Sequence, residues 1–175
     1  MDMLKHAVLG LLDLEPMTGY DLKRNFDDSV NHFWSADQAQ IYRTLAGLVE
    51  EGLAIVEVIP QEGRPSRKVH HITDAGRAEL DVWLHAAPVP QPQRSEFLAK
   101  LFFASRLPEP DLASLLDARR DAVRAQQARL TALAAAEGPG ATHAERLRLA
   151  TLGNGLAHLQ TELDWLENLE RELGA

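Results

Sequence analysis

The stretch LAIVEVIPQEGRPSRKVHHI, residues 53–72, decides the fold of the first half of the chain. LAIVEVI is rich in β-branched residues, and SRKVHHI follows it after a turn marked by glycine and proline, which indicates two antiparallel strands. Arg64, Arg67 and Lys68 lie at or beside this turn, where long cationic side chains can contact phosphates. The stretch therefore predicts a β-hairpin with a basic tip.

Three helices are predicted before the hairpin. Residues 3–14 carry apolar residues at helical spacing, and Thr18 is placed to cap a short second helix over 19–26. The third helix, over residues 35–52, begins with a capping box at Ser35 and ends at a glycine. The second and third helices have the spacing of a helix-turn-helix.

A fourth helix is predicted after the hairpin. Thr73 caps it, it runs to about residue 85, and its apolar residues Leu80, Trp83 and Leu84 are expected to be buried. A helix-turn-helix followed by a hairpin is the order of a winged helix, in which the second helix of the pair enters the major groove of DNA.

The outward face of the third helix is small and lightly polar, which suits close approach to a duplex. Its members are Ala39, Gln40, Arg43, Ala46 and Gly47, with Tyr42 and Thr44 on the flanks. Arg43 and Gln40 are the candidates for contact with base edges, and Tyr42 is placed for the backbone. Lys23 and Arg24 of the second helix are further candidates for phosphate contacts.

The second half of the chain is predicted to be helical. A proline-rich linker over 87–94 separates a DNA-binding domain, 1–86, from a helical domain, 95–175. The expected fold class is therefore mainly α with a small β-hairpin: an N-terminal winged helix-turn-helix domain followed by a coiled-coil-like dimerisation domain.

Leucines in the last helix recur in steps of three and four and form one seam. The seam comprises Leu152, Leu156, Leu159, Leu163 and Leu166. An antiparallel partner within the chain explains part of it, but two long seams on a small domain leave apolar surface uncovered. That surplus favours a homodimer.

Composition narrows the choice of function. The formal net charge is -8, which argues against nucleic acid as a partner unless cations gather on one face, as they do at the hairpin. There is no cysteine and no run of apolar residues long enough for a membrane span, so we expect a cytoplasmic protein. No cofactor, metal site or catalytic motif is predicted.

Several motifs in this order resemble the PadR-type family of transcriptional regulators. They are AVLGLL, PMTGYDL, FW, QIYRTL, EEGL and GRPSRKVHHITDAGRAEL, which together cover about residues 4–84. The resemblance implies a dimeric repressor that binds a two-fold-related DNA operator and is released by a small ligand. It assigns DNA contact to Tyr42, to Gln40 and to the hairpin tip over 64–68, which is the wing of the family, and it gives Tyr20 a supporting role in the helix-turn-helix.

Two features depart from the family pattern. Arg43 stands where the family often has proline, and the winged domain counts eight Lys and Arg against fourteen Asp and Glu. The alternative is therefore a winged-helix module that binds a protein partner, and an enzyme acting on a small aromatic substrate is a third reading. A hydrophobic or aromatic effector is expected near four aromatic residues: Phe97, Phe102, Phe103 and Trp165.

Overall fold

The computed structural model describes residues 3–89 and 94–174 of the chain. The chain divides into two compact units, Met1–Val89 and Pro90–Ala175. Residues 90–93 of the predicted linker lie outside the described part of the structure. Among the described helices, none is long and apolar enough to cross a lipid bilayer.

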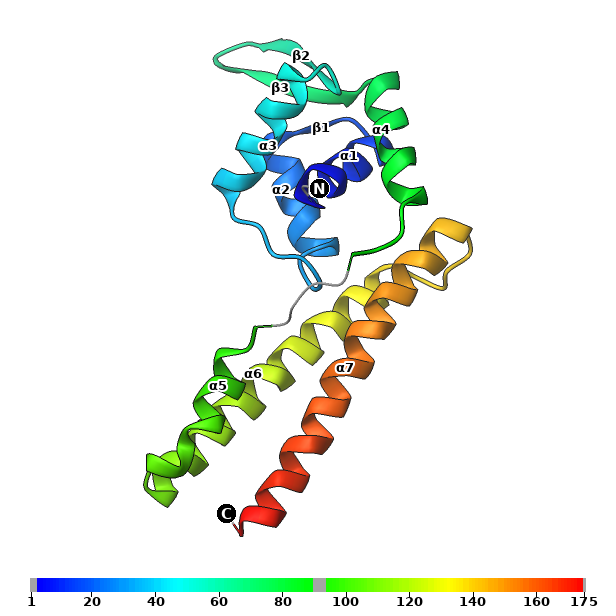
Figure 1. Ribbon diagram of the computed structural model, residues 1–175. Coiled ribbons are helices and arrows are strands. Elements are labelled where there is room, and N and C mark those ends of the chain that lie inside the picture. The colour runs from blue at the N-terminus through cyan, green and yellow to red at the C-terminus, as the bar shows by residue number, and fades with distance from the viewer. Residues whose placement is uncertain (1–2, 90–93, 175) are drawn as a thin grey trace. The chain divides into compact units, whose positions relative to one another are not determined.

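The first unit has the element order of a winged helix (Figure 1). Its elements are α1 (Met3–Leu14), β1 (Met17–Thr18), α2 (Gly19–Ser29), α3 (Gln38–Glu50), β2 (Ala54–Gln61), β3 (Arg64–Ile72) and α4 (Asp74–His85). The prediction of three helices, a hairpin and a fourth helix is confirmed.

Helix α1 lies in the centre of the first unit. It contacts α2, α3, α4 and β3, and its Val8 and Leu9 are fully buried. Leu22 and Phe26 of α2 and Ile41 of α3 are buried in the same cluster. Burying one such side chain contributes about 1.5–3 kcal/mol, so this shared core fixes the two helices of the helix-turn-helix on α1.

The hairpin belongs to a three-stranded antiparallel sheet with the strand order β1-β3-β2. Strand β1 pairs Met17 with His70 and Thr18 with Val69, and the sequence does not predict it because two residues are too few to show alternation. Strand β2 lies at the edge of the sheet, where Pro60 is tolerated. Strand β1 fastens the hairpin to the start of α2.

The cap of α3 differs from the prediction by two residues. The Asp37 side chain accepts a hydrogen bond from the backbone N–H of Gln40 at 2.7 Å, and Gln40 Oε1 accepts one from the backbone N–H of Asp37 at 2.9 Å. Ser35 lies outside the helix because the preceding segment forms turns, closed by a bond from Trp34 N–H to the Val30 carbonyl oxygen. The capping box is therefore real but begins at Asp37.

The buried face of α4 is narrower than predicted. Leu80 is buried and Trp83 packs against the core, whereas Leu84 is 63% exposed. The buried face follows Gly76, Leu80 and Trp83, and Leu84 lies about 100° around the helix from Trp83. The prediction that Leu84 is buried was wrong.

The second unit is a pair of long helices preceded by a short one. Its elements are α5 (Glu96–Phe102), the 3-10 helix η1 (Ala104–Arg106), α6 (Glu109–Ala136) and α7 (His143–Leu173). Helices α6 and α7 run antiparallel, side by side (Figure 1). The apolar cluster between them contains Val123, Leu130, Leu152, Leu159 and Leu163.

Candidate nucleic-acid interface

The outward face of α3 lies where helical periodicity predicts it. Ile41, Leu45 and Leu48 are buried on one side, whereas Gln40 and Arg43 are exposed on the other. The exposed or half-exposed residues of this face also include Ala39, Tyr42, Thr44, Ala46 and Gly47. A duplex that approached α3 would meet short side chains and a few polar groups.

Tyr42 is held against the first residue of α2. A Cβ atom on Gly19 would lie 2.8 Å from Tyr42 Cε1, so only glycine allows this close contact. The ring is nevertheless 43% exposed and remains accessible from outside. Tyr20, to which the resemblance gives a supporting role, is 67% exposed and contributes little to the core.

Gln40 and Arg43 differ in how much of each side chain is already engaged. Gln40 Oε1 accepts the capping hydrogen bond, so its amide nitrogen is the group left for a ligand. Arg43 Nε donates to the Ala39 carbonyl oxygen at 3.3 Å, and within the described residues Arg43 forms no ion pair. No carboxylate of the described residues neutralises the Arg43 guanidinium, which can therefore bind an external acceptor.

The hairpin has its turn between Gln61 and Arg64, and Gly63 adopts a φ of 68° that favours glycine there. Arg64 begins β3, but its side chain lies outside the described part of the structure. Lys68 is exposed on β3 opposite Val58, and the described part of the chain supplies it with no carboxylate partner. Lys68 is thus an available cation of the wing.

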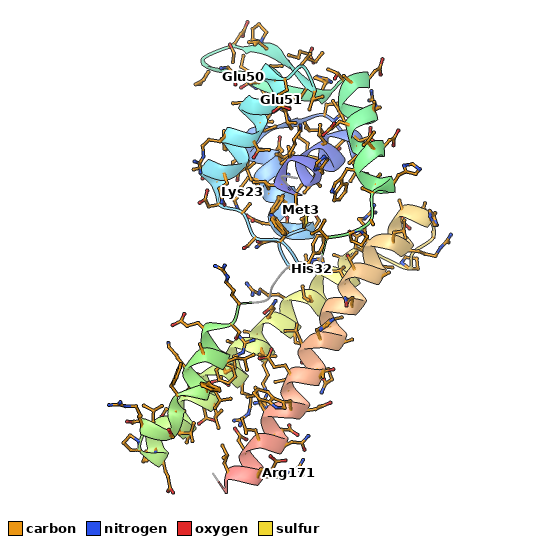
Figure 2. All side chains as sticks on the ribbon, viewed as in Figure 1. Met3, Lys23, His32, Glu50, Glu51 and Arg171 are labelled. Atoms are coloured by element: carbon orange, nitrogen blue, oxygen red, sulfur yellow. The ribbon has the colours of Figure 1, made fainter. Side chains whose placement is uncertain are left out.

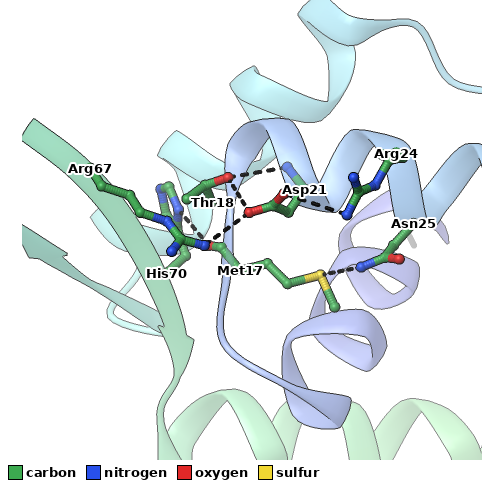
Figure 3. A network of polar contacts seen from close by, with 7 residues as sticks. All are labelled: Met17, Thr18, Asp21, Arg24, Asn25, Arg67 and His70. Atoms are coloured by element: carbon green, nitrogen blue, oxygen red, sulfur yellow. Dashed lines mark hydrogen bonds and ion pairs between the residues drawn. The ribbon is translucent and has the colours of Figure 1, made fainter. Parts of the chain in front are cut away.

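Arg67, in contrast, binds α2 through Asp21 (Figure 3). Arg67 Nη2 donates to Asp21 Oδ2 at 3.1 Å, and the Thr18 hydroxyl donates to the same oxygen at 2.8 Å. Asp21 Oδ1 lies 3.7 Å from Arg24 Nη2. The Thr18 hydroxyl and then the Arg67 guanidinium hold the pKa of the Asp21 carboxyl below its usual value of 3.8.

The remaining cations and acids near this face are also arranged in pairs. Lys23 forms an ion pair with Asp27 one turn further along α2. Figure 2 shows Glu50 and Glu51 together at the C-terminal end of α3, where Glu51 accepts from Lys5 at 2.7 Å. Local carboxylates therefore neutralise much of the positive charge that the sequence places here.

The two adjacent histidines of β3 do not converge on one site. His70 Nδ1 lies 3.4 Å from the Met17 carbonyl oxygen, whereas His71 Nε2 lies 2.9 Å from Glu57 Oε2. Burial lowers the pKa of His70 from its usual 6.5, and the Met17 carbonyl opposes that change. Across residues 3–89 and 94–174, no group of three or more His, Asp or Glu could hold a metal ion.

The leucine seam of α7 packs within one chain. Leu152, Leu159, Leu163 and Leu166 are buried, and Leu156 is half-buried against the α6–α7 cluster. The seam is occupied because α6 supplies the facing apolar residues. Four of these five leucines are buried within one chain and Leu156 is half-buried, and their role as dimer contacts stays a prediction.

The structure separates the four predicted effector residues into two pairs. The rings of Phe97 and Trp165 meet edge to face at 6.3 Å, and those of Phe102 and Phe103 meet at 5.0 Å. Phe102 and Phe103 are 81% and 67% exposed. Phe97 of the first pair lines a hollow of about 520 Å³ between α5 and α6.

The sequence did not predict two polar residues, Arg119 beside the Phe97 ring and Asp21 beside the hairpin, that hold these parts of the structure together. Arg119 forms two 2.7 Å hydrogen bonds with Glu162 and lies 5.5 Å from the centre of the Phe97 ring. Asp21 was passed over because its partner Arg67 is 46 residues away along the chain. The only local signal was its position three residues after Thr18, at the start of a helix.

Comparison with known proteins supports a winged-helix regulator with a helical second unit. Residues 8–82 match the transcriptional regulator PadR-like family, and residues 93–174 match the family described as virulence activator alpha C-term. The negative transcriptional regulator PadR of Bacillus subtilis (strain 168) is 30% identical over 178 residues, which span 97% of this chain and 96% of that protein.

Two solved structures of Bacillus subtilis PadR share the fold. The complex with operator DNA has a TM-score of 0.83 and 28% identity, over 95% of this chain and 96% of that one. The complex with p-coumaric acid has a TM-score of 0.78 and 26% identity, over 98% and 99%. The likeness extends over both units, and the chain belongs to the PadR-like family of transcriptional regulators.

Proposed function

We propose that the protein is a dimeric, cytoplasmic repressor that binds a two-fold-related operator in double-stranded DNA and leaves it when a small ligand binds. In this proposal α3 enters the major groove and the hairpin tip contacts the backbone. The observation that carries it is the outward face of α3, where Gln40, Tyr42 and Arg43 are exposed together. Bacillus subtilis PadR, which shares the fold, was solved in complex with operator DNA, and this supports a DNA-binding role for the chain.

The dimer contact that we propose uses apolar residues exposed in the second unit. They are Leu98, Phe102, Phe103, Leu107 and Trp165. Exposed apolar residues gathered on short segments are typical of protein interfaces. A two-fold dimer would present two copies of α3 to two half-sites, as palindromic operators require.

The effector that we propose is a small aromatic carboxylate, bound in the pocket between α5 and α6. The pocket is lined by Phe97, Leu115 and Ala122 and by three cations, of which Lys100 pairs with Glu96 and Arg119 with Glu162, while Arg94 has no ion pair among the described residues. An aromatic ring suits the apolar wall, and an anionic group suits the cations. The structure of Bacillus subtilis PadR with p-coumaric acid supports this chemical class.

DNA binding is tested by fluorescence anisotropy of the purified protein on the duplex upstream of its own gene. A scrambled duplex of the same composition is the control, and both are titrated at several salt concentrations. We expect preference for the upstream duplex and an affinity that falls as salt rises. Equal affinity for every upstream fragment and for its scrambled control would refute the proposal.

Effector binding is tested separately, by titrating the protein with p-coumaric acid and following tryptophan fluorescence. We expect saturable quenching and release of the operator. Arg94→Ala should weaken both effects because it removes a cation from the pocket. Arg106→Ala, which removes an arginine that does not line the pocket, should leave both unchanged.

The acidity of the first unit favours one second candidate, a winged-helix module that binds a protein. The eight Lys and Arg of residues 1–86 are outnumbered by fourteen Asp and Glu. This candidate predicts no sequence preference on DNA even at low salt, together with a stable complex with a basic protein partner. The anisotropy experiment decides between the two.

A further inference from the structure

Three of the cations around the proposed DNA face are held by carboxylates of the same unit. Lys23 pairs with Asp27, whereas Arg24 and Arg67 share Asp21. A duplex phosphate must therefore compete with a carboxylate for each of these three cations. Competition of this kind affects every DNA sequence equally, because phosphates carry no sequence information.

Asp21 differs from Asp27 because it holds cations from two elements. Arg67 comes from β3, at 3.1 Å from Asp21 Oδ2, and Arg24 comes from α2, at 3.7 Å from Oδ1. More than half of each arginine side chain is exposed. Figure 3 shows both arginines in contact with Asp21, and the exposed fractions of their side chains leave them accessible to solvent.

We infer that Asp21 is a positioning residue that limits the sequence-independent part of DNA affinity by acting as a built-in counterion for Arg67 and Arg24. The inference rests on the proposed DNA-binding function and adds a control on its strength. With both arginines retained by Asp21, affinity depends more on the exposed face of α3. Once an effector disturbs that face, less residual attraction holds the protein on DNA.

The physical basis is counterion release. A cation that binds a phosphate frees about 0.9 salt ions, which gives the affinity its dependence on salt. A carboxylate fixed in the protein cannot leave in this way, so a cation paired with it contributes less. Exposed ion pairs are weak, about 0–1 kcal/mol, so removing Asp21 should release the arginines without unfolding the unit.

The test compares Asp21→Asn with Asp28→Asn. Asparagine can still accept from the Thr18 hydroxyl, so the start of α2 keeps its bond while the charge is lost. Asp28 lies seven residues along the same helix, therefore on the same face, and within the described residues it has no ion-pair partner. The two variants change net charge equally but only one releases the arginines.

We expect Asp21→Asn to bind a scrambled duplex roughly tenfold more tightly at 0.1 M salt, and to steepen the logarithmic salt slope by about 1–2. Operator affinity should rise by a similar factor. Asp28→Asn should change both quantities much less. In an Arg67→Ala background, Asp21→Asn should lose roughly half of its effect, because Arg24 is then the only one of the two arginines left to be released.

Three results would overturn the inference. Weaker binding by Asp21→Asn, with a lower melting temperature, would show that Asp21 only supports the fold. Equal gains for both variants would indicate a general charge effect. An unchanged salt slope would exclude a role as counterion. The scrambled-duplex measurement decides this even if the wild-type protein shows no operator preference, which would refute the proposed function instead.

Discussion

Arg43 and Lys68 are exposed cations without a carboxylate partner among the described residues, but they lie on different elements. Arg43 lies on α3, where it can reach base edges, so Arg43→Ala should cost roughly 1–3 kcal/mol on the operator and relax sequence preference. Lys68 lies on the hairpin, so Lys68→Ala should weaken all duplexes alike. Anisotropy on operator and scrambled DNA measures both, and equal losses from Arg43→Ala on the two duplexes would contradict its role in base reading.

His70 should make the first unit less stable in mild acid. Burial lowers its folded-state pKa below 6.5, so between these two pKa values the unfolded chain binds more protons than the folded one. The contribution of the buried, neutral His70 ring to the free energy of unfolding is fully present above pH 6.5. It is lost as the pH falls towards the folded-state pKa. Urea titrations from pH 7.5 to 5 should show a smaller loss in His70→Gln than in the wild type.

His71→Gln is the control for that titration, since it removes the neighbouring histidine, which contacts Glu57. The His71→Gln variant should still lose unfolding free energy with falling pH, because its His70 ring remains buried. If His70→Gln and the wild type lose stability in parallel, burial of the His70 ring does not cause the acid sensitivity.

For single residues, the sequence predicts which side chains are exposed better than it predicts which side chains form ion pairs. Helical periodicity was enough to place Gln40 and Arg43 outward, because the buried positions of α3 repeat every three or four residues. The bond from Arg67 to Asp21 could not be predicted, since it depends on how the hairpin lies against α2. Pairings between distant residues become visible only once the fold is known.

The cap of α3 is a prediction at the scale of the element. Asp37→Ala removes a reciprocal capping box and should lower the free energy of unfolding by about 1 kcal/mol, with a matching loss of operator affinity as the start of α3 frays. Ser35→Ala changes a neighbouring polar residue that lies outside the helix and should have almost no effect. Urea unfolding followed by circular dichroism compares them, and a larger loss from Ser35→Ala would restore the original assignment of the cap.

The sequence predicts helices and strands well where the hydrophobic pattern spans many residues, and poorly where it spans only a few. The long helices and the hairpin follow from periodicity and β-branched content, while β1 has only two residues. The start of the helical domain predicted over 95–175 is interrupted, with α5 ending at Phe102 and η1 following. A change from an α-helix to a short 3-10 helix depends on packing rather than on residue preference.

At the scale of the whole molecule, the dimer is tested by light scattering. We expect twice the mass of one chain at micromolar concentration, and Phe102→Glu should lower it because a charge replaces an exposed apolar ring in the proposed contact. Its helix content should not change. Leu159→Glu should instead unfold the α6–α7 pair, since Leu159 lies in the cluster between these helices.

A monomeric wild-type protein would refute the dimer, and an unaltered mass for Phe102→Glu would refute this contact. The leucine seam illustrates why the sequence could not settle the matter. Spacing shows that a helix has an apolar side, but not whether the partner helix belongs to the same chain. Here α6 covers most of the seam, and the exposed apolar residues lie elsewhere in the second unit.

The capping box of α3 also restricts what the operator can contain. A glutamine that reads adenine by two bonds needs both its carbonyl oxygen and its amide nitrogen. Gln40 commits its oxygen to the backbone N–H of Asp37 and therefore meets a base as a donor. The base contacted by Gln40 should thus be one that offers an acceptor, such as guanine O6 or N7, thymine O4 or adenine N7. The bond that starts the helix therefore disfavours cytosine beneath Gln40, because the major-groove edge of cytosine offers only a donor.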